Sequence, residues 1–458
     1  MKKFIISFLL LSVVTLTYSQ NEEAVDAVKE ERHVIDSLSG DIVKSGWTFG
    51  PLPVIAFDAD QGLQYGALVN FFYYGDEGIR YPDYDHSLYL EWSRYTKGSG
   101  INRIAFDSRT LIPGVRLTTD LSYLTEKALN FYGFNGYEVA YMPEWEDDTS
   151  ADYISRMFYR HERKMFRFMA DFQGKLAGDN LLWYGGINIS HIKVATVDIE
   201  HLNEGKDPED ILPDTNLLYD KYVEWGLIEE NEAEGGYYNY ISGGLVWDSR
   251  DNEACPMSGI WSEVVFRAAP GFLGNGDYGN LKIAITHRQY FTIIPRNLSF
   301  AYRLGFQSTI AGDASFYSQP LMAYSFYKGV LSQGLGGGKT IRGVLRNRVI
   351  GDAFIYGNFE FRWKIIHTQI LNQNIYIALN GFFDTGKTLR EYDIDKSSID
   401  PADLALYFDQ ENDSFHNSAG GGIRFALNQN FIVAVDYGVS LDKRDGTSGM
   451  YIGLNYLF

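Results

Sequence analysis

The sequence has almost no cysteine and, beyond its first residues, no long hydrophobic run. Its one cysteine, Cys255, cannot form an internal disulfide, so the chain is not a disulfide-stapled secreted domain. After Gln20 no apolar run reaches the roughly 18 to 20 residues that a membrane-spanning helix needs, which excludes a helical membrane protein. Basic residues are also few, and a net charge of -19 argues against a nucleic-acid partner, because phosphates need a basic surface.

The one apolar run lies at the start of the chain. Two lysines precede about 14 mostly apolar residues, the pattern of a signal peptide over residues 1–19 with cleavage near Ser19 and Gln20. Residues 20–46 are polar, with a weak helical spacing of apolar side chains. We expect them to form a short periplasmic lead, either flexible or partly helical.

Aromatic residues are abundant, with 33 Tyr and 30 Phe. From Gly46 onward, runs of about 8 to 12 residues alternate apolar and polar side chains between Gly, Asp, Asn and Pro, the pattern of strands with one apolar face. At about 3.3 Å per residue and a tilt near 40°, such a strand crosses an apolar band of about 25 Å. The predicted strands are 53–58, 63–72, 86–95, 101–109, 115–124, 164–174, 181–193, 237–248, 260–268, 279–291, 298–309, 353–365, 374–384, 417–425, 430–439 and 448–458.

Loop lengths distinguish a membrane barrel from a soluble sandwich, which would show the same alternation. The four longest connections, about 125–163, 194–236, 310–352 and 385–416, all follow odd-numbered strands. With a periplasmic N-terminus they all lie outside the cell, the asymmetry of outer-membrane barrels. The sequence therefore predicts an all-β fold, an antiparallel transmembrane β-barrel of about sixteen strands over residues 47–458. Both termini are expected in the periplasm of a Gram-negative bacterium.

The C-terminus carries the sharpest local pattern. Apolar residues occupy alternate positions up to the terminal aromatic, and Tyr456 and Phe458 end the run. This resembles the C-terminal signature that assembly machinery reads on nascent barrels. Closing the barrel with this strand leaves no unpaired edge in lipid.

Four segments of the second half resemble the BamA/TamA-type superfamily of outer-membrane assembly and translocation barrels. Asp248, Arg250 and Asp251, followed by a Pro and a Gly, are similar to the family's turn motif. Residues 335–337 and 341–344 resemble the tip of the family's sixth extracellular loop. Residues 359–361 and 382–386 resemble the acidic strands that follow that loop. The resemblance covers roughly residues 53–458.

A guanidinium between two carboxylates is predicted in the lumen. Arg342 lies at the tip of a loop long enough to fold back inside, and Glu360 and Asp384 share the parity of the polar positions on their strands. Charge-assisted hydrogen bonds would hold the three together. The resemblance implies the same role, in which Arg342 and Gly343 lock the sixth extracellular loop in the lumen. Val344 departs from the aromatic of the family motif, so docking is expected to be looser.

Other chemistry has no visible carrier in the sequence. The run Gly334 to Thr340 lacks the first glycine of a phosphate-binding loop and its strand-to-helix setting. Neither a zinc-protease His pair nor a serine nucleophile elbow occurs, and two acidic loops offer no spaced set of calcium ligands. We therefore expect no enzyme activity, no catalytic residue, no cofactor and no metal.

Two classes of function remain open. The resemblance implies an accessory component in insertion or export of outer-membrane proteins, with outer-membrane lipid, a larger barrel-assembly complex and client outer-membrane proteins as partners. We expect the role to be accessory because too few residues precede the first strand for the family's periplasmic polypeptide-transport domains. The alternative is a pore or structural barrel without insertase activity, since fold does not fix function. A lipid-handling or adhesive role is a third, weaker interpretation.

Overall fold

The structure of this chain is a computed structural model that describes residues 40–58, 61–78, 81–325, 334–409 and 411–458. The chain divides into two units, residues 1–43 and 44–458. All strands and helices of the described residues belong to the second unit. The predicted signal peptide and the larger part of the predicted lead, residues 20–39, lie outside the described residues.

Seventeen strands form a single antiparallel sheet within the described residues. They are β1 (Trp47–Asp58), β2 (Gly62–Tyr73), β3 (His86–Tyr95), β4 (Gly100–Ile112), β5 (Val115–Asn130), β6 (Arg160–Ala177), β7 (Leu181–Ala195), β8 (Gly235–Tyr237), β9 (Tyr240–Asp248), β10 (Gly259–Ala269), β11 (Asn280–Ile294), β12 (Leu298–Gly312), β13 (Ala353–Ile370), β14 (Gln373–Arg390), β15 (His416–Leu427), β16 (Phe431–Ser440) and β17 (Ser448–Leu454).

Short helices occur only in the connections of the described chain. The α-helices are α1 (Ile199–Asn203), α2 (Leu218–Glu224), α3 (Glu230–Ala233) and α4 (Pro401–Tyr407). The 3-10 helices are η2 (Gly136–Glu138), η3 (Pro143–Trp145), η4 (Pro208–Asp210), η5 (Gly271–Leu273), η6 (Phe316–Ser318), η7 (Lys396–Ser398) and η8 (Lys443–Asp445). None of the helices in the described residues is long and apolar enough to span a bilayer.

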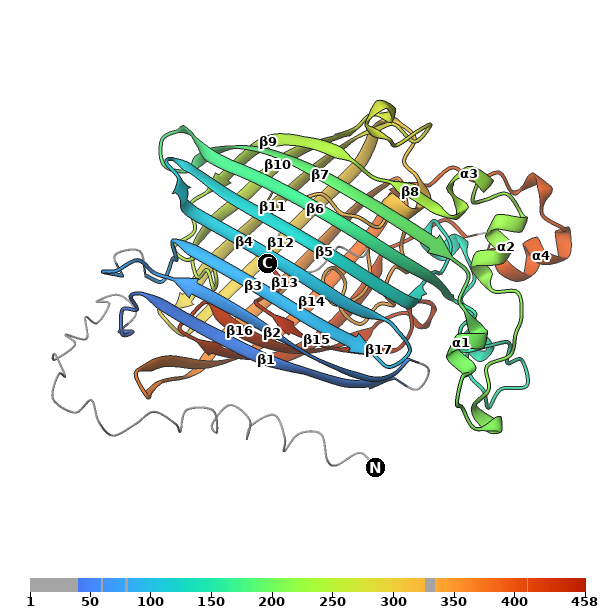
Figure 1. Ribbon diagram of the computed structural model, residues 1–458, viewed down its shortest axis with the longest axis horizontal. Helices are drawn as coiled ribbons and strands as arrows, with labels where there is room; N and C mark the ends of the chain where they lie inside the picture. Colours follow the sequence, from blue (N-terminus) through green and yellow to red (C-terminus); the bar gives the residue numbers. More distant parts are fainter. Residues whose placement is uncertain (1–39, 59–60, 79–80, 326–333, 410) are drawn as a thin grey trace. The chain divides into compact units, whose positions relative to one another are not determined.

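The strands follow chain order around a barrel (Figure 1). Residue registers join each strand to the next one in the chain, from β1 with β2 to β16 with β17, except β8 with β9. β8 and β9 both pair with β7, β8 at residues 191–193 and β9 at 181–188, so they share one place in the wall. The barrel thus has the sixteen strand positions that the sequence predicts, and the all-β antiparallel fold is confirmed.

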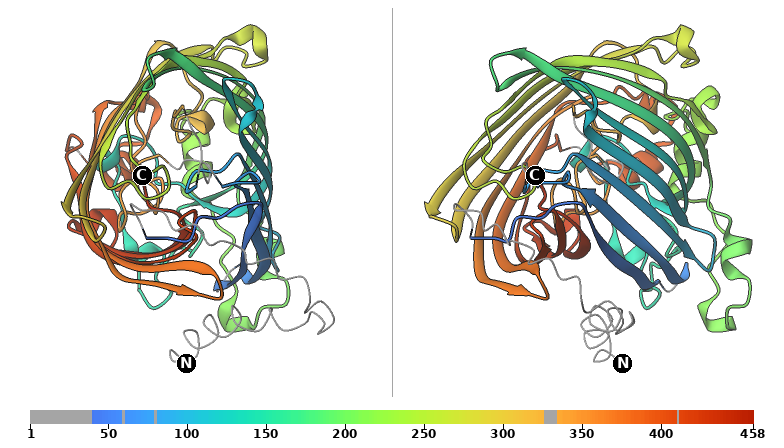
Figure 2. Two further views of the ribbon diagram at one scale, coloured as in Figure 1. Left: turned by 90° about the vertical axis from the view of Figure 1, so that its left-hand side faces the viewer. Right: turned by 60° about the vertical axis from the view of Figure 1, so that its left-hand side comes forward.

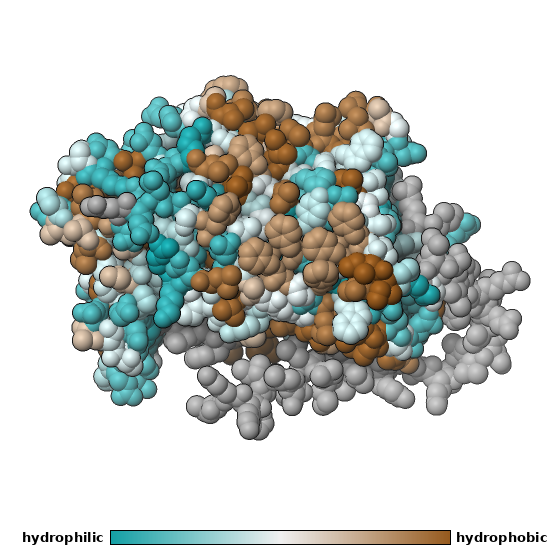
Figure 3. All heavy atoms as spheres, turned by 180° about the vertical axis from the view of Figure 1, so that it is seen from behind, coloured by the Kyte–Doolittle hydropathy of each residue, from teal (hydrophilic) through white to brown (hydrophobic). Residues whose placement is uncertain are grey.

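Side chains alternate between a lumen face and an outer face, because successive residues of a strand point to opposite sides. On β12, Arg303 is 3% exposed and faces inward, whereas its neighbour Leu304 is 46% exposed on the outer wall. Figure 3 shows hydrophobic residues gathered over the wall and hydrophilic residues gathered over the end that carries the long loops. This distribution suits a barrel whose wall faces lipid.

The two ends of the barrel differ. Residues 131–159, 196–234, 313–352 and 391–415 connect strands at one end, called here the long-loop end (Figure 1, right side). There aromatic and aliphatic side chains of the loops bury one another in one cluster. At the other end, called here the short-turn end, most connections have two or three residues, and only 74–85 and 249–258 are longer. Figure 2 shows chain segments inside the ring of strands.

The first and last strands differ from the prediction. β1 starts at Trp47, ahead of the predicted start at residue 53, and runs through Pro51 and Pro53. Its register with β2 is unbroken at both prolines, so their nitrogens fit only where they point away from β2. β17 ends at Leu454 and not at Phe458, because Asn455 takes a positive φ of 67° and turns the last residues out of the wall.

Candidate functional site

The tip of the loop 313–352, called here loop six, is held by Arg342. Its Nε and Nη2 donate to the two carboxylate oxygens of Asp384 at 2.8 and 3.0 Å, and its backbone N–H donates to the same group at 3.1 Å. Nη1 lies 2.7 Å from Glu360 and 3.4 Å from Asp436, and the guanidinium stacks 3.5 Å above the ring of Phe382. Arg342 is fully buried, so this set of contacts is a charge-paired joint without solvent.

Gly343 lets the tip of loop six touch the wall backbone. Its φ is 100°, and a Cβ at this position would lie 2.8 Å from backbone atoms of Gly438 and Val439 on β16. A Cβ on Gly438 would in turn lie 2.5 Å from the carbonyl oxygen of Arg342. The Gly343 N–H donates to the Tyr451 hydroxyl of β17 at 2.9 Å. Any larger residue at 343 would push the tip away from the last two strands.

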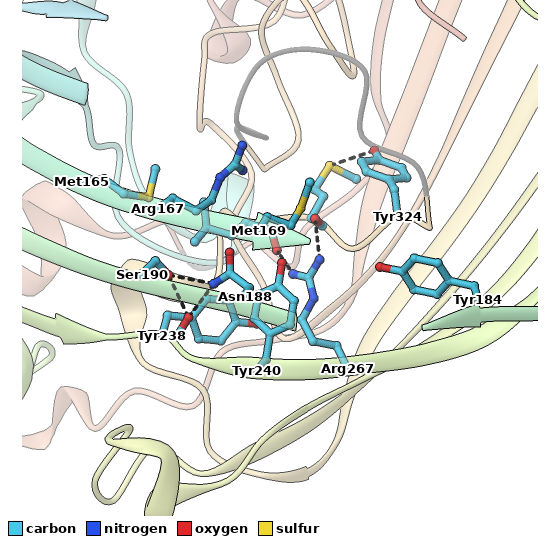
Figure 4. A pocket seen from close by; sticks show the side chains of 12 residues that line it. Met165, Arg167, Met169, Tyr184, Asn188, Ser190, Tyr238, Tyr240, Arg267 and Tyr324 are labelled. Carbon is cyan, nitrogen blue, oxygen red and sulfur yellow. Dashed lines mark hydrogen bonds between the residues drawn. The ribbon is translucent and has the colours of Figure 1, made fainter. Parts of the chain in front are cut away.

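The first arm of loop six is bound through its backbone. Figure 4 shows Arg267 of β10 reaching the loop, where it donates to the carbonyls of Leu321 and Met322 at 3.2 and 3.3 Å. On β12, Gln307 bonds both the N–H and the carbonyl of Ala323. Side chains from several strands therefore hold this arm much as a neighbouring strand would.

Beyond its tip, loop six crosses to the N-terminal side of the barrel. Arg346 donates to Glu126 of β5 at 2.7 Å, and the Asn347 side chain donates to the carbonyl of Asn130, also on β5. Arg348 donates to the carbonyls of Gly136 and Val139 in loop 131–159. The predicted residues Arg342 of loop six, Glu360 of β13 and Asp384 of β14 thus lie together, and loop six contacts both sides of the barrel.

Several partners of this joint are not predicted as such from the sequence. Asp436 lies between Arg342 and Arg424, accepting two hydrogen bonds of 2.8 Å from the latter. Arg362 donates to Glu360 at 2.8 Å. Their inward parity was visible, but which strands face each other across the lumen was not. In the described part of the chain no group of three His, Cys, Asp or Glu residues could hold a metal ion.

The predicted turn motif shapes connection 249–258. Arg250 donates to both carboxylate oxygens of Asp248, each at 2.9 Å, and stacks 4.3 Å from the ring of Trp261. Asp251 accepts the N–H groups of Met257 and Ser258. The motif therefore builds a rigid turn, and it lies apart from the Arg342 joint.

The wall has a seam between its first and last strands. Among the described residues no residue register joins β17 to β1, although every other neighbouring pair has one. One apolar cluster contains Leu52 of β1, Phe431 and Val433 of β16, and Leu454 of β17. The seam is therefore filled by side chains where the rest of the wall is closed by backbone hydrogen bonds.

Other contacts bridge the two sides of the seam at the short-turn end. In connection 74–85, the Tyr74 hydroxyl accepts from Asn430 at 2.9 Å, and the Tyr81 hydroxyl accepts from Asn374 at 2.8 Å.

The predicted C-terminal residues lie inside the barrel. Tyr456 and Phe458 are buried, and the carboxylate of Phe458 accepts a hydrogen bond from Arg362 at 3.0 Å.

Comparison with known proteins gives the family. Residues 191–458, more than half of the chain, match the Omp85 superfamily domain. No curated protein matches the sequence. The structure resembles CdiB from Escherichia coli, with a TM-score of 0.52 and 10% identity over 89% of this chain and 62% of that one. It also resembles BamA from Haemophilus ducreyi lacking POTRA domains 1-3, with a TM-score of 0.47 and 14% identity over 90% and 69%.

The family match covers the half of the chain that carries the turn motif, the loop-six tip and the acidic strands. The resemblance predicted from those motifs is thereby confirmed. This chain spans less than two thirds of the length of the CdiB chain, whose likeness bears on the fold alone. The chain belongs to the Omp85 superfamily and is an outer-membrane β-barrel of a family that inserts or translocates proteins.

Proposed function

We propose that this barrel is an accessory component in the insertion or export of outer-membrane proteins, and that its wall opens to client strands at the seam between β1 and β17. Its expected partners are outer-membrane lipid, a larger barrel-assembly complex and client outer-membrane proteins. In this proposal Arg342 and Gly343, with Glu360 and Asp384, lock loop six in the lumen during that work.

The missing ladder at the seam carries the proposal. Unpaired backbone groups in lipid cost several kcal/mol each, so a barrel gains by closing its wall completely. Pro51 and Pro53 fit β1 only with their nitrogens turned from β2, which leaves two fewer donors on the seam edge. Opening the wall at this edge of β1, so that it pairs with a client strand, therefore needs less free energy than separating any other pair of neighbouring strands.

A crosslink across the seam tests the proposal. With Cys255 replaced by Ala, the pair Leu52→Cys and Leu454→Cys joins two residues of the seam cluster. The matched control is Ile285→Cys with Phe306→Cys, which face each other in the β11–β12 ladder. The readout is the amount of newly made outer-membrane protein that reaches a heat-resistant folded form in cells carrying each variant.

Oxidation of the seam pair should reduce client assembly several-fold, and reduction should restore it. The control pair should have no effect in either state. Full assembly with a complete seam crosslink would overturn lateral opening. A gentle detergent pull-down from outer membranes adds an independent check, because an accessory role requires assembly-complex subunits to copurify.

A structural barrel that does not open is the second candidate. The observation that favours it is the set of contacts across the seam at the short-turn end, where Asn430 and Asn374 bond the hydroxyls of Tyr74 and Tyr81. In that case the crosslinked and reduced forms would behave alike, and the barrel would purify without partners.

A further inference from the structure

A cavity of about 140 Å³ lies in the lumen beside the Arg342 joint. It is bounded by inner faces of β10, β11 and β12, by loop-six residues 339 and 340, and by the C-terminal residues 454–458. A space of this size holds several water molecules or one small polyatomic ion. Its lining is basic and aromatic.

Three cations on this lining have no carboxylate partner in the described part of the chain. Arg303, which is buried, bonds only neutral oxygens, those of the Asn358 side chain at 2.8 Å and the Lys339 carbonyl at 3.1 Å. The Nε of Arg288 is buried without an acceptor. The Lys339 ammonium has neither a hydrogen bond nor an ion pair with a described residue, and its Nζ lies 3.9 Å from the Cβ position of Gly453.

The carboxylates near the cavity are engaged elsewhere. Glu253, also on the lining, lies within ion-pair distance of Arg109 and Arg116. Arg250 is paired with Asp248, so it adds no excess charge. The C-terminal carboxylate at Phe458 supplies one negative charge against the three cations, and one of its oxygens already accepts a hydrogen bond from Arg362.

The neighbouring joint shows what balanced charge looks like in the same lumen. There three arginines, at 342, 362 and 424, meet three carboxylates, at 360, 384 and 436. A buried cation without a counter-ion is costly, because the lost hydration is not replaced. An excess of two positive charges around a cavity therefore favours an anion inside it.

We propose that this cavity is a binding site for a phosphate-type oxyanion, held by Arg288, Arg303 and Lys339. Guanidinium groups donate paired hydrogen bonds to phosphate oxygens, and an ammonium adds a compact charge. Trp261 on the same lining lies against the guanidinium of Arg288, which places that cation at the cavity. The oxyanion is either free phosphate or the headgroup of a lipid, and the site does not depend on the seam proposal.

The first test uses the full chain in detergent, delipidated and buffered without phosphate. Inorganic phosphate is titrated against chloride at equal ionic strength, and the temperature at which the folded form disappears on gels is measured. Phosphate should raise that temperature saturably. Lys339→Gln and Arg288→Gln should each raise the half-saturating phosphate concentration at least tenfold. Lys175→Gln, which changes an exposed lysine at the short-turn end, should match the wild type.

The Arg288→Gln variant keeps the test usable if Lys339→Gln or Arg303→Gln fails to fold. It should fold because the Arg288 guanidinium makes no hydrogen bond or ion pair within the described residues, so its loss breaks none. The second arm measures phosphorus and lipid retained by protein that has not been delipidated. Retained phospholipid that is lost in the variants assigns a headgroup; saturable phosphate binding by delipidated protein assigns the free anion. A response equal to chloride, with no retained lipid, overturns the site.

Discussion

Buried charges in the lumen are matched residue by residue around Arg342. Asp384 accepts a bidentate hydrogen bond from Arg342, and Glu360 lies between Arg342 and Arg362. The ring of Phe382 packs on the face of the Arg342 guanidinium. Such a joint is sensitive to loss of one member, because the remaining charges stay buried without compensation. Its geometry also requires a planar fork, which lysine lacks.

Arg342→Ala should lower the stability of the folded barrel by about 3 to 5 kcal/mol, because Glu360 and Asp384 lose their cation in a dry site. Arg342→Lys should recover only part of this. The measurement is the temperature at which the fast-migrating folded form is lost on unboiled gels, together with protease sensitivity of loop six.

Arg346→Ala is the matched control for that prediction. Its ion pair with Glu126 is partly exposed, so its loss should cost at most about 1 kcal/mol. Equal melting of the Arg342→Ala, Arg346→Ala and wild-type proteins would contradict the lock.

The pairing of Arg342 with Glu360 and Asp384 could be predicted because parity along a strand decides which face a side chain takes. The contact between Asp436 and Arg342 could not be predicted, since the distance between them depends on barrel curvature. The contact between Gly343 and Gly438 was equally hidden. The sequence shows a glycine at each of these two positions, but it does not show that their backbones are in contact.

Among the elements, the contact between α3 and η6 joins two long loops through one buried carboxyl. Glu232 of α3 accepts the N–H of Phe316 at 2.8 Å. Burial raises the pKa of Glu232 from 4.5 to about 7. Between these two values the folded loop binds a proton that the unfolded loop lacks, so the folded loop with Glu232 buried is most stable below about pH 4.5 and loses stability as the pH rises to 7.

Protease sensitivity of the loops 196–234 and 313–352 should therefore increase between about pH 4.5 and pH 7. Glu232→Gln, which stays neutral, should keep the loops protected across this range. Digestion of intact cells or liposomes at a series of pH values measures this. An identical pH dependence in the variant and the wild type would mean that another group controls the loops.

The elements of the wall were predictable because alternation repeats over every strand, and all sixteen strand positions were predicted. The break at Tyr238 and Asn239, which separates β8 from β9, was not, because both flanking segments keep strand-like composition. The helices α1 to α4 have four to seven residues, too few for a helical period to show. The early end of β17 depends on one residue, Asn455, with a left-handed backbone.

In the whole molecule, chain segments occupy the lumen at both ends. Loop six fills the long-loop end, and at the short-turn end Glu253 of connection 249–258 contacts Arg109 and Arg116 on the opposite side of the barrel. A pore needs a continuous water path, so this arrangement favours a closed barrel.

Wild-type protein in planar bilayers should accordingly show little conductance. Glu253→Ala frees connection 249–258 from Arg109 and Arg116 and should raise the conductance several-fold. Asp179→Ala, a change of an exposed carboxylate at the same end, should have no effect. A large open conductance in the wild type would instead support the pore.

Loop six also sets a limit on how far the wall can part. Gly343 is fixed to β16 and β17 on one side of the seam, and Arg346 is fixed to β5 on the other. Three residue steps of extended chain reach at most about 10 to 11 Å. While both attachments hold, loop six is a short tether between β5 and the last two strands, and their distance at the long-loop end can grow only by the slack left in those three steps and in the Arg346 side chain. A wide separation of β5 from β16 and β17 must begin at the short-turn end or wait for one attachment to release.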